Sequence, residues 1–302
     1  MKSIILGAGG QDGHFLYKHL LKQGHEVLCF SHRSGSNYPA LDVGDFEKVE
    51  NIVREIKPDY VYHLAAKSST RHEFILQNQR SIVSGTLAIL EAVDKFSRNT
   101  KVFLASSGLI FRNEQRPIAA EDELQISSAY SVARIEALQI ARYYHSRGIK
   151  VYVGHLFNHE SPLRPSGSVV RSLVKDVVDI SVGKTETFTI GNPEVVKEWM
   201  WAGDAVAAIQ IFMRQDDIFE ICLADGEGIS VRRYAELCCE KVGISYQSHH
   251  VTSSGYQTEY SMLVGNSETI RGLGWSPKVN IESLVARMVE SEILSRNDKN
   301  NV

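Results

Sequence analysis

Three glycines spaced three residues apart follow the first apolar run of the chain. The run Ser3–Leu6 predicts a short buried strand, and the amphipathic segment Gly13–Gln23 predicts a helix directly after it. Between the two, Gly7 permits a tight turn, Gly10 permits close approach to the backbone, and Gly13 permits close packing of helix against strand. The start of such a helix offers free N–H groups to a pyrophosphate. We therefore expect a dinucleotide-binding turn here, although glycines also form ordinary turns.

The first half of the chain alternates short apolar runs with amphipathic segments of helix length. The predicted elements are strands at Glu26–Phe30, Tyr60–Leu64, Val102–Ala105 and Val151–Leu156, and helices at Phe46–Ile56, Ile82–Phe96 and Ser131–Ser146. This alternation predicts a parallel sheet covered by helices on both faces. The expected fold class is therefore α/β: a Rossmann-type doubly wound parallel sheet with a smaller C-terminal substrate-binding lobe.

The character of the sequence changes after about Phe157. Pro162, Pro165 and Gly167 interrupt the regular alternation, and later apolar runs such as Phe188–Ile190 are isolated. We expect residues 1–157 to form the dinucleotide-binding domain. Residues 158–302 are expected to form mostly a substrate lobe, interleaved with the last elements of the sheet.

Composition excludes several classes of function. The net charge is −3, so no bulk electrostatic field favours nucleic acid or an anionic membrane. No stretch approaches the roughly 20 apolar residues that span a bilayer, and the N-terminal run breaks at glycines too early for a signal peptide. The four cysteines lack the spacing of metal ligands, so we expect no metal site and buried free thiols in a reducing cytoplasm.

The end of the second predicted strand bears on the type of dinucleotide. A carboxylate at that position would bind the ribose 2′-hydroxyl of NAD, but the chain offers Arg33 and Ser34. These side chains suit a 2′-phosphate, so NADP is favoured, with NAD as the alternative and a solvated loop arginine as the plainer interpretation. Asp42 and Val43, after the third strand position, are candidates for contacting the adenine edge.

Tyr130 and Arg134 lie four residues apart and therefore share one face of a predicted helix. Ser107 follows the strand Val102–Ala105, whose C-terminal end should face the dinucleotide. Such a set suits hydride transfer, because a phenolate accepts the substrate hydroxyl proton, a serine orients that oxygen and a cation stabilises the phenolate. Many nicotinamide enzymes have Lys where Arg134 stands, and an arginine keeps the charge but cannot release a proton. We expect altered or reduced chemistry; the alternative is a half-buried structural tyrosine.

Several longer stretches resemble the extended short-chain dehydrogenase/reductase family, most closely its GDP-mannose 4,6-dehydratase branch. The resemblance is carried by GAGGQDGHFLYKHLLKQGHEV (Gly7–Val27), HLAAKSS (His63–Ser69), HLFNHESPLR (His155–Arg164), KEWMWAGDAV (Lys197–Val206) and GLGWSPKVNIESLVARMV (Gly272–Val289). These stretches span nearly the whole chain, and the string Phe157–Pro162 is much more specific than the glycine turn.

The resemblance implies roles for individual residues. Ser107 and Tyr130 match the catalytic Ser/Thr and Tyr, and Arg134 stands at the position of the catalytic Lys. The implied cofactor contacts are Gly7, Gly10, Gln11, Asp12, Gly13, Arg33, Ser34, Asp42, Val43, Leu64, Ala65 and Ala66. The implied contacts with a nucleotide-activated sugar, for which a GDP-hexose is favoured, are Asn158, Arg164, Val169, Arg171, Lys197 and Glu259.

The resemblance also implies a homodimer or homotetramer and a place in polysaccharide biosynthesis. Members of this family commonly associate through helices packed as a four-helix bundle, and Ile82–Phe96 and Ser131–Ser146 are the candidates here. The alternative is that the apolar residues of these helices face only their own sheet.

One departure from the family concerns the base that dehydration requires. Dehydratases oxidise C4 of the sugar, remove the acidified C5 proton, eliminate the C6 hydroxide and return the hydride to C6. A Glu two residues after the catalytic Ser/Thr takes the C5 proton, but here that residue is Leu109, which cannot accept one. The spacing of Glu114 and Glu160 supports neither as a replacement. Tyr256 also stands near the position expected for an Arg that holds the substrate phosphates.

Three functions remain open. NADP-dependent hydride transfer at sugar C4, as a 4-ketoreductase, C4 dehydrogenase or epimerase, is favoured. The alternatives are GDP-mannose 4,6-dehydration with a relocated base, and non-catalytic binding of NADP or a nucleotide-sugar. A ketoreductase consumes NADPH, a dehydratase forms a 4-keto product without net NADPH change, and a binding protein shows no turnover.

Overall fold

The centre of the molecule is a six-stranded sheet in which every neighbouring pair of strands is parallel. The computed structural model describes residues 1–32, 37–165, 167–253, 258 and 260–300. The strands of this sheet are β1 (Lys2–Leu6), β2 (Glu26–Phe30), β3 (Tyr60–His63), β4 (Lys101–Ser107), β5 (Val151–Leu156) and β10 (Glu220–Leu223). They lie in the order β10-β5-β4-β3-β1-β2.

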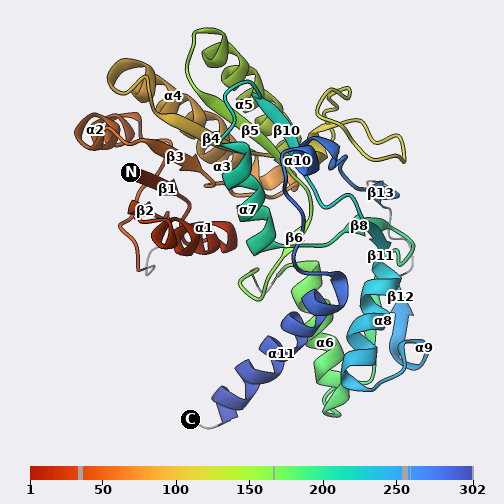
Figure 1. The fold of residues 1–302 in the computed structure, drawn as a ribbon. Helices are drawn as coiled ribbons and strands as arrows, with labels where there is room; N and C mark the ends of the chain where they lie inside the picture. The colour runs from red at the N-terminus through yellow and green to blue at the C-terminus, as the bar shows by residue number, and fades with distance from the viewer. Residues whose placement is uncertain (33–36, 166, 254–257, 259, 301–302) are drawn as a thin grey trace.

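Helices cover both faces of this sheet (Figure 1). One layer holds α1 (Gln11–Lys22), α7 (Ala202–Phe212) and the short α10 (Glu268–Gly272), and the other holds α2 (Phe46–Ile56), α4 (Gly85–Phe96) and α5 (Ala129–Ser146). In β1, Ile4 and Leu6 enter the core of the second layer, while Ile5 enters that of the first. A strand buried on both faces carries a continuous apolar run, which confirms the predicted α/β doubly wound fold.

Two elements differ from the sequence prediction. The predicted helix Ile82–Phe96 begins inside a longer segment, where η1 (His72–Phe74), α3 (Ile75–Asn78) and a π-helical turn, η2 (Gln79–Ser84), lead into α4. Between β2 and α2, where the sequence predicts no strand, an isolated parallel bridge joins Ser31 and Ala40.

The C-terminal lobe is built on the helices α6 (Val169–Ser181), α8 (Val231–Val242) and α11 (Ile281–Asn300), which share a hydrophobic core. Its remaining elements are β6 (His159–Glu160), β7 (Phe188–Ile190), β8 (Val196–Glu198), β9 (Met200–Trp201), β11 (Gly228–Ser230), α9 (Tyr246–His249), β12 (His250–Thr252) and β13 (Met262–Leu263). Small sheets join β11-β8-β13, β12-β7 and β6-β9. Two elements from residues 158–302 belong to the large sheet and its helical layer, namely β10 and α7. The domain boundary at residue 157 stays a prediction.

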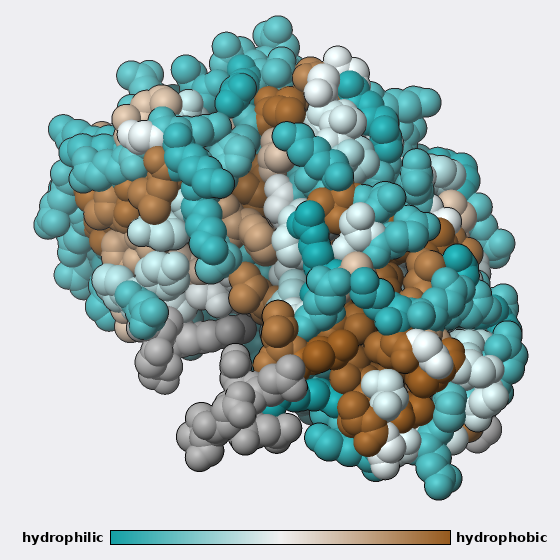
Figure 2. All heavy atoms as spheres, turned by 60° about the horizontal axis from the view of Figure 1, so that its bottom comes forward, coloured by the Kyte–Doolittle hydropathy of each residue, from teal (hydrophilic) through white to brown (hydrophobic). Residues whose placement is uncertain are grey.

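The surface and the cysteines add three observations. Figure 2 shows hydrophobic side chains gathered on the C-terminal lobe, whose exposed apolar residues include Val182, Ile293 and Leu294.

In the part of the chain that the structure describes, no helix combines the length and apolar character needed to cross a bilayer. All four cysteines are buried and unpaired, as expected.

Candidate active site

The glycine turn lies where the order of the sheet reverses. From β1 the chain crosses to β2 on one side, and later returns to β3 on the other, which opens a crevice at the carboxyl ends of the strands. Gly7 has a φ of +97°, and a Cβ there would lie 2.7 Å from the backbone nitrogen of Ala65. A Cβ on Gly13 would lie 2.6 Å from the Cα of Ala8. Only glycine fits either position.

The start of α1 is suited to a phosphate. Gly10 is the N-cap residue, and no side chain caps this helix end. The N–H groups of a first helical turn have no partner within the helix, and together with the helix dipole they attract an anion. The turn therefore fits the pyrophosphate of a nicotinamide dinucleotide.

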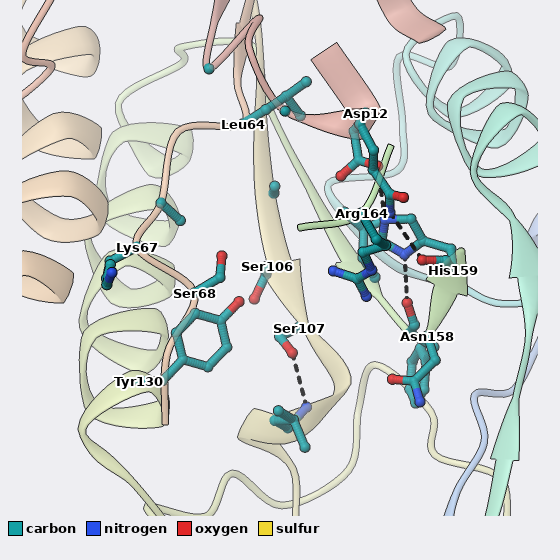
Figure 3. A pocket seen from close by; sticks show the side chains of 18 of the residues that line it. Asp12, Leu64, Lys67, Ser68, Ser106, Ser107, Tyr130, Asn158, His159 and Arg164 are labelled. Atoms are coloured by element: carbon teal, nitrogen blue, oxygen red, sulfur yellow. Dashed lines mark hydrogen bonds and ion pairs between the residues drawn. The ribbon is translucent and has the colours of Figure 1, made fainter. Parts of the chain in front are cut away.

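A cavity of about 330 Å³ opens at this crevice and contains most of the predicted site residues. Those that line it are Gly7, Gly10, Gln11, Asp12, Gly13, Leu64, Ala66, Ser107, Tyr130, Arg134, Asn158 and Arg164. Figure 3 shows Tyr130 on one wall, with Asp12, His159 and Arg164 gathered on the opposite wall. The structure thus brings the predicted cofactor turn and the predicted catalytic helix to one cavity.

Tyr130 and Arg134 form a buried pair. The Nε of Arg134 donates a hydrogen bond of 3.0 Å to the hydroxyl oxygen of Tyr130, and its Nη1 donates to the carbonyl oxygen of Ala105 at the end of β4. A capping box between Ser128 and Ser131 begins α5 and fixes Tyr130 in its first turn. Because the phenol oxygen accepts from Arg134, its own proton is free to point into the cavity (Figure 3).

Two serine hydroxyls reach the same cavity. The Oγ of Ser107 accepts a hydrogen bond of 3.2 Å from the N–H of Leu109, and its own proton remains available. Ser106 also lines the cavity, and its buried Oγ has no partner within the described structure. Strand alternation predicts that only one of two successive residues faces a given side. Both serines line the cavity here because β4 ends at Ser107 and turns into η3 (Gly108–Ile110).

The base position of the dehydratases carries no carboxylate. Leu109 lines the cavity, and among the described lining residues Asp12 is the single carboxylate. Glu114 forms an ion pair with Arg116 at 3.2 Å, Glu160 forms one with Arg164 at 3.1 Å, and neither lines the cavity.

Asp12 is held by a histidine. The Nδ1 of His159 lies 2.7 Å from the carbonyl oxygen of Phe157, and its Nε2 lies 2.9 Å from Oδ1 of Asp12. Burial lowers the pKa of His159, but the Asp12 carboxylate outweighs it, and the pKa ends above its ordinary value. Burial raises the pKa of Asp12, yet the charge of His159, its hydrogen bond and Arg164 bring it below the usual range. Both shifts favour the charged forms, so the two side chains form a partly buried ion pair.

Other predicted residues lie outside the cavity wall. Asp42 accepts from Arg80 at 2.5 Å and from the N–H of Gly44 at 2.9 Å, and Val43 is buried in the core beneath α4. Neither residue lines the cavity, and their contact with the adenine stays a prediction. Ala65 contacts the glycine turn through its backbone without lining the cavity.

Three of the predicted sugar contacts do not line this cavity, and their role stays a prediction. Val169 is exposed at the start of α6, and Arg171 donates to the carbonyl oxygen of Arg164 at 2.9 Å. The ammonium of Lys197 lies 5.3 Å from the ring centroid of Tyr260. None of the three lines the cavity. Four residues named from the sequence lie outside the described residues: Arg33, Ser34, Tyr256 and Glu259.

Some lining residues were not predicted. They include Lys67, Ser68, Thr70, Ser106, His159 and Leu163. Lys67 and Ser68 follow the carboxyl end of β3, so their position after a central strand was an available signal. The Lys67 ammonium rests 4.2 Å from the ring centroid of Phe74.

The doubly wound sheet, the glycine turn and the Tyr130–Arg134 pair at one cavity are typical of the extended short-chain dehydrogenases/reductases. The sequence profile of the GDP-mannose 4,6 dehydratase family matches residues 4–288, and the chain belongs to this family. It is 28% identical to GDP-mannose 4,6 dehydratase 1 of Arabidopsis thaliana, over 98% of this chain and 91% of that protein. It is also 28% identical to the GDP-mannose 4,6 dehydratase of Homo sapiens, over 96% of this chain and 91% of that protein.

Solved structures share the fold at lower identity. The UDP-glucose 4-epimerase of Thermus thermophilus, in complex with NAD, superposes with a TM-score of 0.84 at 20% identity, covering 97% of this chain and 99% of that one. RMD from Pseudomonas aeruginosa, complexed with NADPH, has a TM-score of 0.84 at 18% identity, covering 97% and 98%. Likeness at these identities shows the fold alone.

Proposed function

We propose that this protein is a nicotinamide-dependent oxidoreductase acting at C4 of a nucleotide-activated hexose, as a 4-ketoreductase, C4 dehydrogenase or epimerase. The observation that carries this proposal is the Tyr130–Arg134 pair at a cavity whose base position is Leu109. That arrangement retains the groups that move a proton at a carbinol oxygen, and it lacks the carboxylate that would remove a proton from C5.

The residues of the chain divide the work as follows. A bound nicotinamide dinucleotide supplies or accepts the hydride. Tyr130 transfers the proton of the substrate oxygen, accepting it during oxidation and donating it during reduction. Ser107, whose hydroxyl proton is free, donates a hydrogen bond that orients the same oxygen. Arg134 stabilises the phenolate of Tyr130 without itself exchanging a proton.

A dehydratase with a relocated base is the second candidate that the family favours. Its requirement is a carboxylate or imidazole within reach of the sugar C5. Asp12 is committed to an ion pair with His159. Glu114 is paired with Arg116 and Glu160 with Arg164, and neither glutamate lines the cavity. The described residues therefore support hydride transfer over elimination.

For the cofactor we propose NADP, with NAD as the alternative. The support is the sequence Arg33-Ser34 after β2, where a carboxylate would favour NAD. Comparing the affinities of NADPH and NADH by fluorescence titration tests this. We expect NADPH to bind more tightly, and a preference for NADH of about tenfold, or ~1.4 kcal/mol, would contradict the role of Arg33.

The proposed substrate is a GDP-hexose, because the relatives over nearly the whole chain are named for GDP-mannose. We further propose self-association through α4 and α5, as a homodimer or homotetramer in the cytoplasm. Light scattering on the purified protein tests the oligomer, and a monomer at micromolar concentration would contradict it.

The decisive experiment offers the purified protein two substrates in parallel. With NADPH and a GDP-4-keto-6-deoxyhexose, we expect loss of NADPH absorbance and formation of the 4-hydroxy sugar. With GDP-mannose and NADP⁺, we expect no dehydrated product. A 4-keto product from GDP-mannose without net NADPH change would identify a dehydratase instead, and cofactor binding without turnover of either substrate would identify a binding protein.

A further inference from the structure

Gln11, the residue after the glycine turn, directs its side chain away from the turn and toward the C-terminal lobe. Its Nε2 donates a hydrogen bond of 3.0 Å to the carbonyl oxygen of His159, and its Oε1 accepts one of 2.8 Å from the hydroxyl of Ser161. Both ends of the amide are thus engaged by residues about 150 positions away in the sequence. Gln11 and Ser161 are buried, so these bonds are shielded from water.

Asp12 makes the next link in the same direction. The carbonyl oxygen of Phe157 can only accept, so Nδ1 of His159 carries a proton, and Nε2 carries the second proton toward the Asp12 carboxylate. The charges that face His159 are Asp12 from α1 and Arg164 from the following loop. The two cations are matched by two carboxylates at the edge of the cavity, because His159 pairs with Asp12 and Arg164 pairs with Glu160.

The segment held in this way carries the predicted sugar contacts. Asn158 directly precedes His159, and its carbonyl oxygen accepts from the N–H of Met200 at the β6–β9 pairing. The hydroxyl of Ser161 also accepts from the N–H of Leu163, at 3.3 Å. Arg164 is clamped to Glu160 through two hydrogen bonds of 3.1 and 3.3 Å. The first turn of α1 thus anchors segment 157–165, which includes the cavity-lining Arg164.

We infer that Gln11 and Asp12 are positioning residues for the nucleotide-sugar, although they stand in the cofactor turn. This inference rests on the proposed function. Their backbone serves the dinucleotide, while their side chains hold segment 157–165 and thereby place Asn158 and Arg164. A carboxylate beside a pyrophosphate is also repulsive, so the side chain of Asp12 has no favourable role toward the cofactor.

The variant Asp12→Asn tests this, because it keeps the size of the side chain and removes its charge. Calorimetric titration with GDP-mannose should show affinity weakened by about tenfold, the scale of one charge-assisted hydrogen bond. Titration with NADP⁺ alone should change by less than about twofold, because the phosphate-facing groups are backbone N–H groups. Asp45→Asn, the same substitution at an exposed helix cap outside the cavity, is the matched control and should alter neither affinity.

Two readouts separate a positioning role from general damage. Amide hydrogen exchange over 157–165 should accelerate in Asp12→Asn without ligand, while exchange in β4 stays as in the wild type. The affinity of the wild type for GDP-mannose should fall as pH rises through the pKa of His159, which Asp12 holds above its ordinary value of 6.5. In Asp12→Asn the same fall should begin at lower pH.

The results that overturn the inference differ from those that overturn the function. Unchanged exchange over 157–165 in Asp12→Asn, or NADP⁺ affinity that falls as much as GDP-mannose affinity, would refute the positioning role. Failure of the wild type to bind GDP-mannose, GDP or UDP-glucose would instead refute the proposed function. Amide hydrogen exchange shows whether Asp12 anchors segment 157–165, whether or not the protein binds a nucleotide-sugar.

Discussion

The Nε of Arg134 lies 3.0 Å from the hydroxyl oxygen of Tyr130, and both side chains are more than nine-tenths buried. The guanidinium donates its Nε–H to the phenol oxygen and thereby fixes the position of that oxygen at the cavity. It cannot relay a proton, as a lysine ammonium can. Proton exchange by Tyr130 must therefore run through the cavity, toward the substrate oxygen and the serine hydroxyls beside it.

Replacing Tyr130 by Phe removes that proton carrier and keeps the ring. We expect turnover of a 4-keto sugar to fall roughly 10²–10⁴-fold, the usual contribution of a general acid or base. Cofactor affinity, measured by fluorescence titration, should stay close to that of the wild type. Tyr143→Phe, on the same helix but 59% exposed, is the control. An undiminished rate in Tyr130→Phe would remove this residue from the mechanism.

Arg134 can be tested by separating its charge from its bulk. Arg134→Met should lower the rate of reduction of a 4-keto sugar roughly 10–10²-fold, because the charge-assisted hydrogen bond that fixes the Tyr130 hydroxyl is lost. Steady-state kinetics with NADPH will show this. Arg134→Lys keeps the charge and should stay within about tenfold of the wild type. An equal rate for the Met variant and the wild type would contradict this role.

Leu109→Glu returns a carboxylate to the wall of the cavity. We expect this variant to gain some conversion of GDP-mannose to a product lighter by one water, detected by mass spectrometry. Leu109→Gln has the same shape without a base, and it should form no such product. If the wild type already dehydrates GDP-mannose as fast as the Glu variant, then another group is the base.

Gly13 is predicted to tolerate no side chain. The Cβ of Gly13→Ala would meet backbone atoms of Gly7 and Ala8 at 2.6 Å, so α1 would be displaced from β1. We expect a loss of about 1–3 kcal/mol in the free energy of unfolding, measured in urea, together with weaker dinucleotide binding. Gly272→Ala, with no atom within 4 Å of its added Cβ, should be close to neutral. Equal stability of the two variants would contradict the tight packing of the turn.

Glu198 predicts a pH dependence of stability. Burial raises the pKa of this carboxyl to about 8, although the N–H groups of Asp225, Gly226 and Gly265 donate to it and oppose the rise. The folded protein therefore holds a proton that the unfolded chain releases near pH 4.5, and stability falls as pH rises between these values. In Glu198→Gln this contribution is absent, so its urea midpoint relative to the wild type should rise with pH. If the difference in urea midpoint between Glu198→Gln and the wild type did not change with pH, Glu198 would be ionised in the folded protein.

Local patterns in the sequence determined the dinucleotide turn and the pairing of Tyr130 with Arg134. A glycine between a strand and a helix, or two residues four apart on one helix, are constrained by backbone geometry over a few residues. For the same reason the strands Glu26–Phe30 and Val151–Leu156 and the helix Phe46–Ile56 were predicted with their observed bounds. The resemblance to the dehydratases, rather than a local pattern, implies a base two residues after Ser107, where the sequence has Leu109.

The contacts between distant segments were decided only by the tertiary structure. The hydrogen bond from Gln11 to His159 joins residues 148 positions apart, and it exists because the chain returns β6 and β9 to the start of α1. The sequence did not indicate that Asp42 would pair with Arg80 or that Val43 would pack at the start of α4, and the structure shows both contacts. Side-chain direction at such places depends on which elements pack nearby, because burial and charge pairing between distant segments outweigh local propensity.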